Sequence, residues 1–141
     1  MAMNSAKASS ELRSAQMAKI KSTNTKPEVA VRKIIHGMGY RFRINYKKMP
    51  GSPDLVMPKY KLAIFVHGCF WHRHKGCRKT RMPKTNVEFW REKFESNIKR
   101  DRLVQNQIRK LGWGVLIIWE CEIVGVEKLQ RKILRKIVKS I

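Results

Sequence analysis

Acidic residues are scarce in this chain of 141 residues: 10 Asp and Glu stand against 32 Lys and Arg, which leaves a formal net charge of +22 at pH 7. Such an excess destabilises the compact state by self-repulsion unless a polyanion binds. A continuous apolar run of membrane-spanning length is also missing, and the basic residues are not gathered into one amphipathic helix, so a membrane is not the expected partner. They occur instead in every third of the chain, which favours binding to the phosphate backbone of a nucleic acid.

The chain is also short, lacks a secretory signal and has an odd number of cysteines. A chain of this length predicts one compact domain, over residues 23–141, preceded by a flexible arm or helix over residues 1–22. The first residues lack the apolar stretch and cleavage site of a signal peptide, so we expect the protein to stay in the cytoplasm. Three cysteines argue against a disulfide framework and leave metal binding, catalysis or burial as their uses.

The first element predicted by the residue pattern is a helix over residues 25–39. Thr25 and Glu28 have the spacing of a capping box, Pro27 falls in the first turn, and Gly39 can end the helix. The apolar side chains expected on one face are Val31, Ile34, Ile35 and Met38.

Four strands and two further helices follow. Residues 40–46 alternate apolar and basic side chains and predict a half-buried strand, residues 54–57 a short one, and residues 62–66 a central one. Helical spacing returns over 86–111, a buried strand is expected over 115–123, and an amphipathic helix closes the chain. This order predicts an α/β fold in which helices flank a mixed sheet.

A short loop carries the residues that suit a structural zinc ion. Cys69, His74 and Cys77 lie within HGCFWHRHKGC, and tetrahedral zinc needs one ligand more. Cys121, expected at the end of a buried strand, could supply it. Two alternatives stay open: Cys121 is simply a small buried residue, or His72 replaces one of the loop ligands.

A second pattern suits a hard metal ion. Asp54 enters one strand and His67 ends another, so neighbouring strand ends can bring together Asp54, the Val66 carbonyl and His67. Oxygen ligands of this kind favour Mg²⁺ and metal-assisted phosphodiester hydrolysis. An Asp after Pro is commonly a turn or cap residue, although the scarcity of acids weakens that alternative.

Four segments in this order resemble the very short patch repair (Vsr) DNA mismatch endonucleases: PGSPDLVM, IFVHGCFWHRHKGC, EFWREKFESNIKRD and LGWGVLIIWEC. The resemblance runs from about Met17 to about Leu129. It implies a PD-(D/E)XK, restriction-endonuclease-like fold in which Phe65-x-His67 replaces the usual E-x-K. It also implies catalytic roles for Asp54 and the Val66 carbonyl as Mg²⁺ ligands, His67 and Glu28 as holders of metal-bound water, His72 as general base or phosphate contact, and Asn97 as an auxiliary group.

The activity implied by the resemblance is a nick 5′ to the T of a T:G mismatch, made by Mg²⁺-dependent phosphodiester hydrolysis, which initiates repair of deaminated 5-methylcytosine. The same comparison supports zinc on Cys69, His74, Cys77 and Cys121. It further implies a monomer that acts on mismatched double-stranded DNA at the bacterial nucleoid, in association with a cytosine-5 methyltransferase and downstream repair proteins.

Mismatch recognition requires apolar side chains that can enter a weakened base step. Phe70 and Trp71 suit that role, with burial in the core as the alternative. By resemblance Trp90 joins them, although its helical spacing with Phe94 also fits the core, and Met17 inserts from the N-terminal arm. Contacts flanking the mismatch are expected from Arg73, Lys75, Lys79 and Arg81.

Two residues have simpler explanations, and two alternative functions stay open. The capping box by itself accounts for Glu28, and His36 is expected to be an ordinary surface residue. A non-catalytic, zinc-stabilised nucleic-acid-binding protein would account for the charge and the zinc ligands but leaves Asp54, His67 and His72 unexplained. A PD-(D/E)XK nuclease without mismatch preference is the other alternative.

Overall fold

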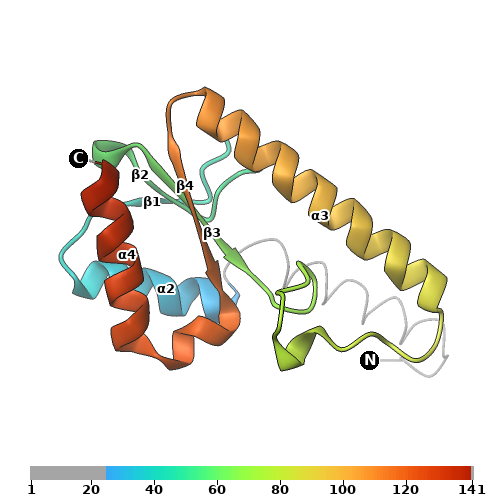
Figure 1. Ribbon diagram of the computed structural model, residues 1–141. Helices are drawn as coiled ribbons and strands as arrows, with labels where there is room; N and C mark the ends of the chain where they lie inside the picture. The colour runs from blue at the N-terminus through green and yellow to red at the C-terminus, as the bar shows by residue number, and fades with distance from the viewer. Residues whose placement is uncertain (1–24, 141) are drawn as a thin grey trace, which may run out of the picture.

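The computed structural model describes residues 25–140, which form a four-stranded mixed sheet between two layers of helix (Figure 1). The predicted arm over residues 1–22, including Met17, lies outside the described residues. The elements are α2 (Lys26–Gly37), β1 (Arg43–Ile44), β2 (Leu55–Met57), η1 (Pro58–Tyr60), β3 (Leu62–His67), η2 (Arg78–Thr80), α3 (Val87–Lys110), β4 (Gly114–Trp119), η3 (Glu120–Val124) and α4 (Val126–Ser140). The predicted α/β class and element order are confirmed.

The sheet has the order β1-β2-β3-β4, with antiparallel pairs except for β3 and β4, which run parallel. A parallel pair needs a long crossover, and here the loop after β3 and the whole of α3 provide it. His67 stands opposite Trp119 in the register. The carboxyl ends of β3 and β4 therefore meet at one edge of the sheet, and the segments that follow them lie close together.

Alternation along the strands supplies a core on each face of the sheet. Helices α2 and α4 cover one face, where Ile35, Ile64 and Ile133 belong to one buried cluster. Helix α3 covers the other face, where Ile108 packs with Ala63 and Phe65. Because side chains alternate faces along a strand, neighbouring residues of β3 feed both cores and make it the centre of the molecule.

Helix α2 begins as the capping pattern predicts. The Thr25 Oγ1 accepts a hydrogen bond from the Glu28 amide at 3.3 Å, and Pro27 lies in the first turn. Val31 and Ile35 are fully buried against the sheet. The Glu28 side chain is also buried, with 4% of the residue exposed, and this charged group points to a use beyond capping.

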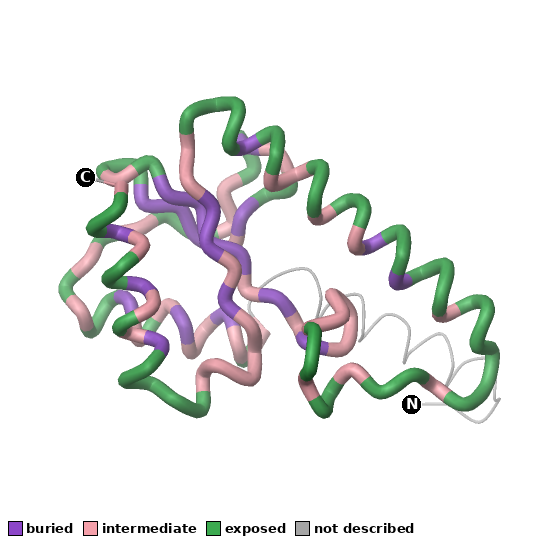
Figure 2. The backbone as a smooth tube through the Cα atoms, in the orientation of Figure 1, coloured by how far each residue is buried: buried purple, intermediate pink, exposed green. Residues whose placement is uncertain are grey.

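Helix α3 is 24 residues long and extends past the sheet. Its C-terminal part packs on the sheet through Ile108, and its N-terminal part runs beside the loop that follows β3, where Phe94 is buried (Figures 1 and 2). Most of its remaining surface is exposed (Figure 2). Within residues 25–140, none of the helices is both long and apolar enough to span a membrane.

Two predicted strands are wrong in extent. The strand expected over residues 40–46 pairs only at Arg43 and Ile44, both exposed, because the chain turns at Asn45 with a φ of 48°. The strand expected over 115–123 ends at Trp119, whose amide donates to the Glu122 carboxylate at 2.9 Å and so begins η3. Cys121 therefore lies in a helical turn and not in a strand.

Candidate active site and metal centre

A cleft of about 730 Å³ lies between the start of α2, the residue before β2, the end of β3 and the middle of α3. The residues that the sequence predicted for catalysis all line it, together with two of the predicted DNA contacts. They are Glu28, Asp54, Val66, His67, Phe70, Trp71, His72 and Asn97.

Two carboxyl groups lie together on one wall of the cleft. The Val66 amide donates to Asp54 Oδ2 at 2.6 Å, which fixes Asp54 against β3. The pKa of Asp54 is raised to about 7: burial is the largest cause, the charge of Glu28 and a hydrogen bond to it add to the rise, and the Val66 hydrogen bond opposes it. Two neighbouring, buried carboxyl groups offer the oxygen ligands that a hard divalent cation prefers, so the residues present fit Mg²⁺.

Two histidines stack beside this pair. The His67 and His72 rings are 3.8 Å apart and 9° from parallel, and only 6% of His67 is exposed. Burial, and after it the neighbouring His72, lowers the pKa of His67 to about 3, while Asp101 acts in the opposite direction. His67 is therefore neutral at ordinary pH.

The sequence reasoning missed Asp101, which orients the second histidine. Its Oδ2 lies 2.7 Å from His72 Nδ1, so Nε2 is the ring nitrogen left to exchange a proton with another group. The available signal was spacing, because Asp101 follows Asn97 by four residues and shares its face of α3.

Asn97 ties α3 to the loop after β3. It is buried, its Nδ2 donates to the Trp71 carbonyl at 3.2 Å, and its Oδ1 accepts from Arg100 at 3.3 Å. Arg100, a second residue that the sequence reasoning missed, also lines the cleft.

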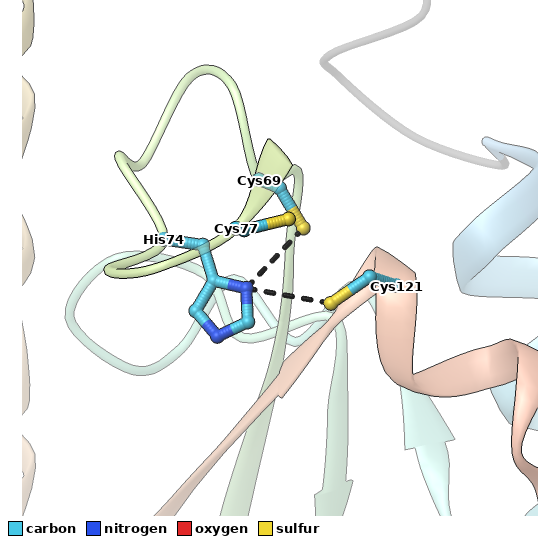
Figure 3. A group of neighbouring side chains, drawn as sticks. All are labelled: Cys69, His74, Cys77 and Cys121. Carbon is cyan, nitrogen blue, oxygen red and sulfur yellow. Dashed lines mark hydrogen bonds between the residues drawn. The ribbon is translucent and has the colours of Figure 1, made fainter. Parts of the chain in front are cut away.

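The four predicted zinc ligands meet at the edge where β3 and β4 end (Figure 3). The ligand atoms of Cys69, His74, Cys77 and Cys121 all lie within 4.8 Å of one another. His74 Nδ1 is 3.5 Å from the Cys69 Sγ and 3.4 Å from the Cys121 Sγ. Three free thiols and one imidazole in this arrangement fit tetrahedral zinc.

The cysteine cluster contains no second histidine, since His72 belongs to the separate group with His67 and Asp101. Trp119 connects the two groups. Its ring stacks on His74 at 4.2 Å and 8°, and it meets His67 edge-on at 5.2 Å and 76°. The cysteine cluster and the paired histidines therefore contact the same tryptophan ring.

The predicted wedge residues form an aromatic cluster at the mouth of the cleft. The Phe70 ring lies 5.1 Å from Trp71, 5.7 Å from Trp90 and 5.2 Å from Phe94. Phe94 is buried, whereas the other three are half-buried. Phe89, which the sequence reasoning missed, extends the cluster and is 59% exposed.

The predicted basic contacts separate into two kinds. Lys75, Lys79 and Arg81 are exposed. Arg73 instead donates to the carbonyls of Phe70 and Thr80, and its guanidinium lies 4.0 Å from the centre of the Phe94 ring. Arg73 therefore stabilises the loop, and its hydrogen-bonding groups are directed at protein atoms.

The chain is similar in sequence to known DNA mismatch endonucleases and nicking enzymes. The family model for the DNA mismatch endonuclease Vsr matches residues 6–79. The type II nicking enzyme V.XorIIP of Xanthomonas oryzae pv. oryzae is 42% identical over 125 residues, which cover 89% of this chain and 91% of that protein. The DNA mismatch endonuclease Vsr of Escherichia coli K12 is 43% identical over 117 residues, covering 83% of this chain and 74% of that protein.

A solved structure shows a similar fold. The catalytic domain of the homing endonuclease I-Bth0305I matches with a TM-score of 0.59 at 22% sequence identity, covering 84% of this chain and 99% of that one. At this level of identity the likeness concerns the fold alone.

Proposed function

The chain belongs to the Vsr family of DNA mismatch endonucleases and is a DNA endonuclease, and on this premise we propose that it nicks one strand 5′ to the T of a T:G mismatch by Mg²⁺-dependent hydrolysis. The observation that carries the proposal is the pair of carboxyls, Asp54 and Glu28, in one cleft with the His72–Asp101 pair. A metal-binding pair and an oriented proton acceptor are the two parts that phosphodiester hydrolysis needs.

The residues proposed to hold Mg²⁺ are Asp54 and the Val66 carbonyl, with Glu28 and His67 around its waters. When bound, the ion supplies positive charge at the scissile phosphate. Asp54 is held in place by the Val66 amide at 2.6 Å, so its carboxylate does not need to reorganise when the cleft is filled. The buried, neutral His67 can accept or donate a hydrogen bond without adding charge.

His72 is proposed as the general base that takes a proton from the attacking water. Asp101 holds Nδ1, which directs Nε2 to the proton and stabilises the imidazolium once the proton has moved. The stacked His67 ring limits rotation of His72. Asn97, buried beside them, is proposed to keep the loop and α3 aligned near the scissile phosphate.

Mismatch selectivity is proposed to come from the aromatic cluster. Phe70, Trp71 and Trp90 are half-buried and line or adjoin the cleft, so they can enter a base step that a T:G pair has weakened. Exposed Lys75, Lys79 and Arg81 would bind flanking phosphates.

The cysteine cluster is proposed to hold structural Zn²⁺, with Cys69, His74, Cys77 and Cys121 as a closed set of ligands. The proposal further includes a monomer acting on nucleoid DNA in the bacterial cytoplasm, after a cytosine-5 methyltransferase and before downstream repair proteins. Repair of deaminated 5-methylcytosine is the process that such a nick would begin.

One assay tests the proposal. A duplex with a single T:G pair and its T:A counterpart, each labelled on either strand, are incubated with the protein in Mg²⁺ or in EDTA. We expect a nick in the T strand of the mismatched duplex, in Mg²⁺ alone, that Asp54→Ala abolishes while gel-shift affinity is kept. Equal cleavage of both duplexes would leave a nuclease without mismatch preference, and comparable nicking by folded Asp54→Ala would overturn the site.

A further inference from the structure

Helix α3 presents one continuous face to the cleft. The lining residues it contributes fall in successive turns of the helix and are Lys93, Asn97, Arg100, Asp101, Val104 and Gln105. Asp54 lines the same cleft. A DNA strand whose phosphate approaches Asp54 therefore also approaches the side chains of α3.

The acidic groups that line the cleft repel a phosphate substrate unless cations offset their charge. Four carboxylic residues line it: Glu28, Asp54, Asp101 and Glu120. Among the described residues that line it, Lys and Arg are represented by Lys93 and Arg100 alone. A phosphodiester gains further negative charge as water attacks, so a cation placed opposite the carboxyl pair would act where charge develops.

Arg100 is held in a defined place and still has donors to offer. One terminal nitrogen donates to Asn97 Oδ1 at 3.3 Å, and the residue is exposed. A guanidinium carries five N–H donors in a rigid planar fork that matches two oxygens of a phosphate. The hydrogen bond to Asn97 uses one of these donors, and others remain to bind a group in the cleft.

Asn97 joins this arginine to the aromatic loop. The same side chain that accepts from Arg100 donates to the Trp71 carbonyl at 3.2 Å, and it is 8% exposed. A buried amide with both ends engaged has little freedom to adjust. The position of the Trp71 backbone and that of the Arg100 guanidinium are therefore coupled through one side chain.

We propose that Arg100 is a catalytic residue that binds the non-bridging oxygens of the scissile phosphate, and that Asn97 positions it according to the placement of Trp71. The inference rests on the proposed function. It gives the aromatic loop a direct connection to the chemistry, because insertion of Trp71 at a mismatch sets the place of the group that stabilises the transition state.

Arg100→Gln and Arg100→Lys test the first half, with Arg102→Gln as the matched control because Arg102 is exposed on the same helix and does not line the cleft. Single-turnover nicking of the T:G duplex is measured at saturating protein, beside gel-shift affinity at the same salt. We expect Arg100→Gln to slow nicking roughly 10²–10³-fold with less than about tenfold loss of affinity, and Arg100→Lys to recover part of the rate. Arg102→Gln should nick at about the rate of the unmodified protein.

Asn97→Ala tests the second half. We expect its nicking rate on T:G to approach its rate on T:A, with affinity near that of the control, at a temperature well below the melting temperature measured for the variant. Equal nicking by Arg100→Gln and Arg102→Gln would overturn the role of Arg100, and unchanged discrimination in Asn97→Ala would overturn the coupling. A failure of the unmodified protein to nick in Mg²⁺ would instead reject the proposed function itself.

Discussion

Single residues in the cleft occupy states that are unfavourable without a ligand. Asp54 is desolvated and faces Glu28, so its pKa rises from 3.8 to about 7. In the metal-free protein this carboxyl contributes stability at low pH, and the contribution is lost as pH rises through about 7. A divalent cation removes the conflict, which explains why two acids are kept together in a chain so short of them.

Proton and Mg²⁺ should therefore compete for Asp54. We expect the apparent affinity for Mg²⁺, measured from the single-turnover rate at a series of ion concentrations, to rise between about pH 5.5 and about pH 8 and then to level. Glu28→Gln removes the neighbouring carboxylate and should move this rise to lower pH. An Mg²⁺ affinity that does not change with pH in the unmodified protein would contradict the assignment of Asp54.

The contact between Asp101 and His72 makes a second prediction at this scale. Asp101→Asn keeps a similar shape but removes the charge that supports the imidazolium. Single-turnover nicking should fall by roughly 10²–10⁴ with DNA affinity kept. Glu95→Gln, an exposed acid on the same helix, serves as the control and should leave the rate unchanged. Equal rates in both variants would remove His72 from proton transfer.

At the scale of elements, the sequence predicted the helices and the central strand, which depend on long periodic patterns or on an unbroken apolar run. The spacing of apolar residues placed α2, α3 and α4, and the central strand β3 lies where an unbroken apolar run stands. Strand ends were less predictable because they depend on single contacts. Asn45 turns the chain out of β1, and Glu122 caps the end of β4, and neither effect has a periodic signal.

Residues of the candidate site that belong to a sequence motif were predicted. Residues that only the fold brings to the cleft were missed. The zinc ligands and Asp54 stand out by residue type, and the structure gathers each of them as the spacing suggested. Asp101 and Arg100 read as ordinary charges on a solvated helix until the fold shows which face meets the cleft. Arg73 stays a predicted DNA contact, and the structure adds that its guanidinium also makes contacts within the loop.

The loop after β3 carries a prediction of its own. Replacing Phe70 and Trp71 together by Ala should reduce the preference for T:G over T:A more than it reduces nonspecific binding, since stacking contacts contribute roughly 1–3 kcal/mol per base. Nicking and gel-shift affinity on both duplexes measure this. Unchanged discrimination in a folded double variant would return the two rings to a purely structural role.

At the scale of the whole molecule, the parallel pair β3 and β4 determines where everything else is placed. Their carboxyl ends bring Cys69 and Cys121 to one edge of the sheet, although 51 positions separate the Cys69 amide from its hydrogen-bond partner Glu120. A metal at that edge would close a long loop that includes α3, so we expect zinc to contribute directly to folding stability.

Metal analysis checks this expectation. The purified protein should contain about one zinc per chain. Cys121→Ala should bind less metal, melt at a lower temperature and be less soluble. A chelator should lower the melting temperature of the unmodified protein. Cys121→His offers a second variant that keeps a ligand and should retain part of the metal. A folded, active and zinc-free preparation would contradict the four-ligand assignment.

The end of β3 and the two residues after it contribute to both proposed metal sites within four consecutive positions. The Val66 amide binds Asp54, His67 lines the cleft, Cys69 belongs to the cysteine cluster, and the Trp119 ring contacts a histidine of each group. In thermodynamic terms, occupancy of one site is then linked to occupancy of the other, and such linkage is reciprocal. If zinc bound at the cysteine cluster strengthens the binding of Mg²⁺ in the cleft, then Mg²⁺ bound in the cleft strengthens the binding of zinc by the same factor.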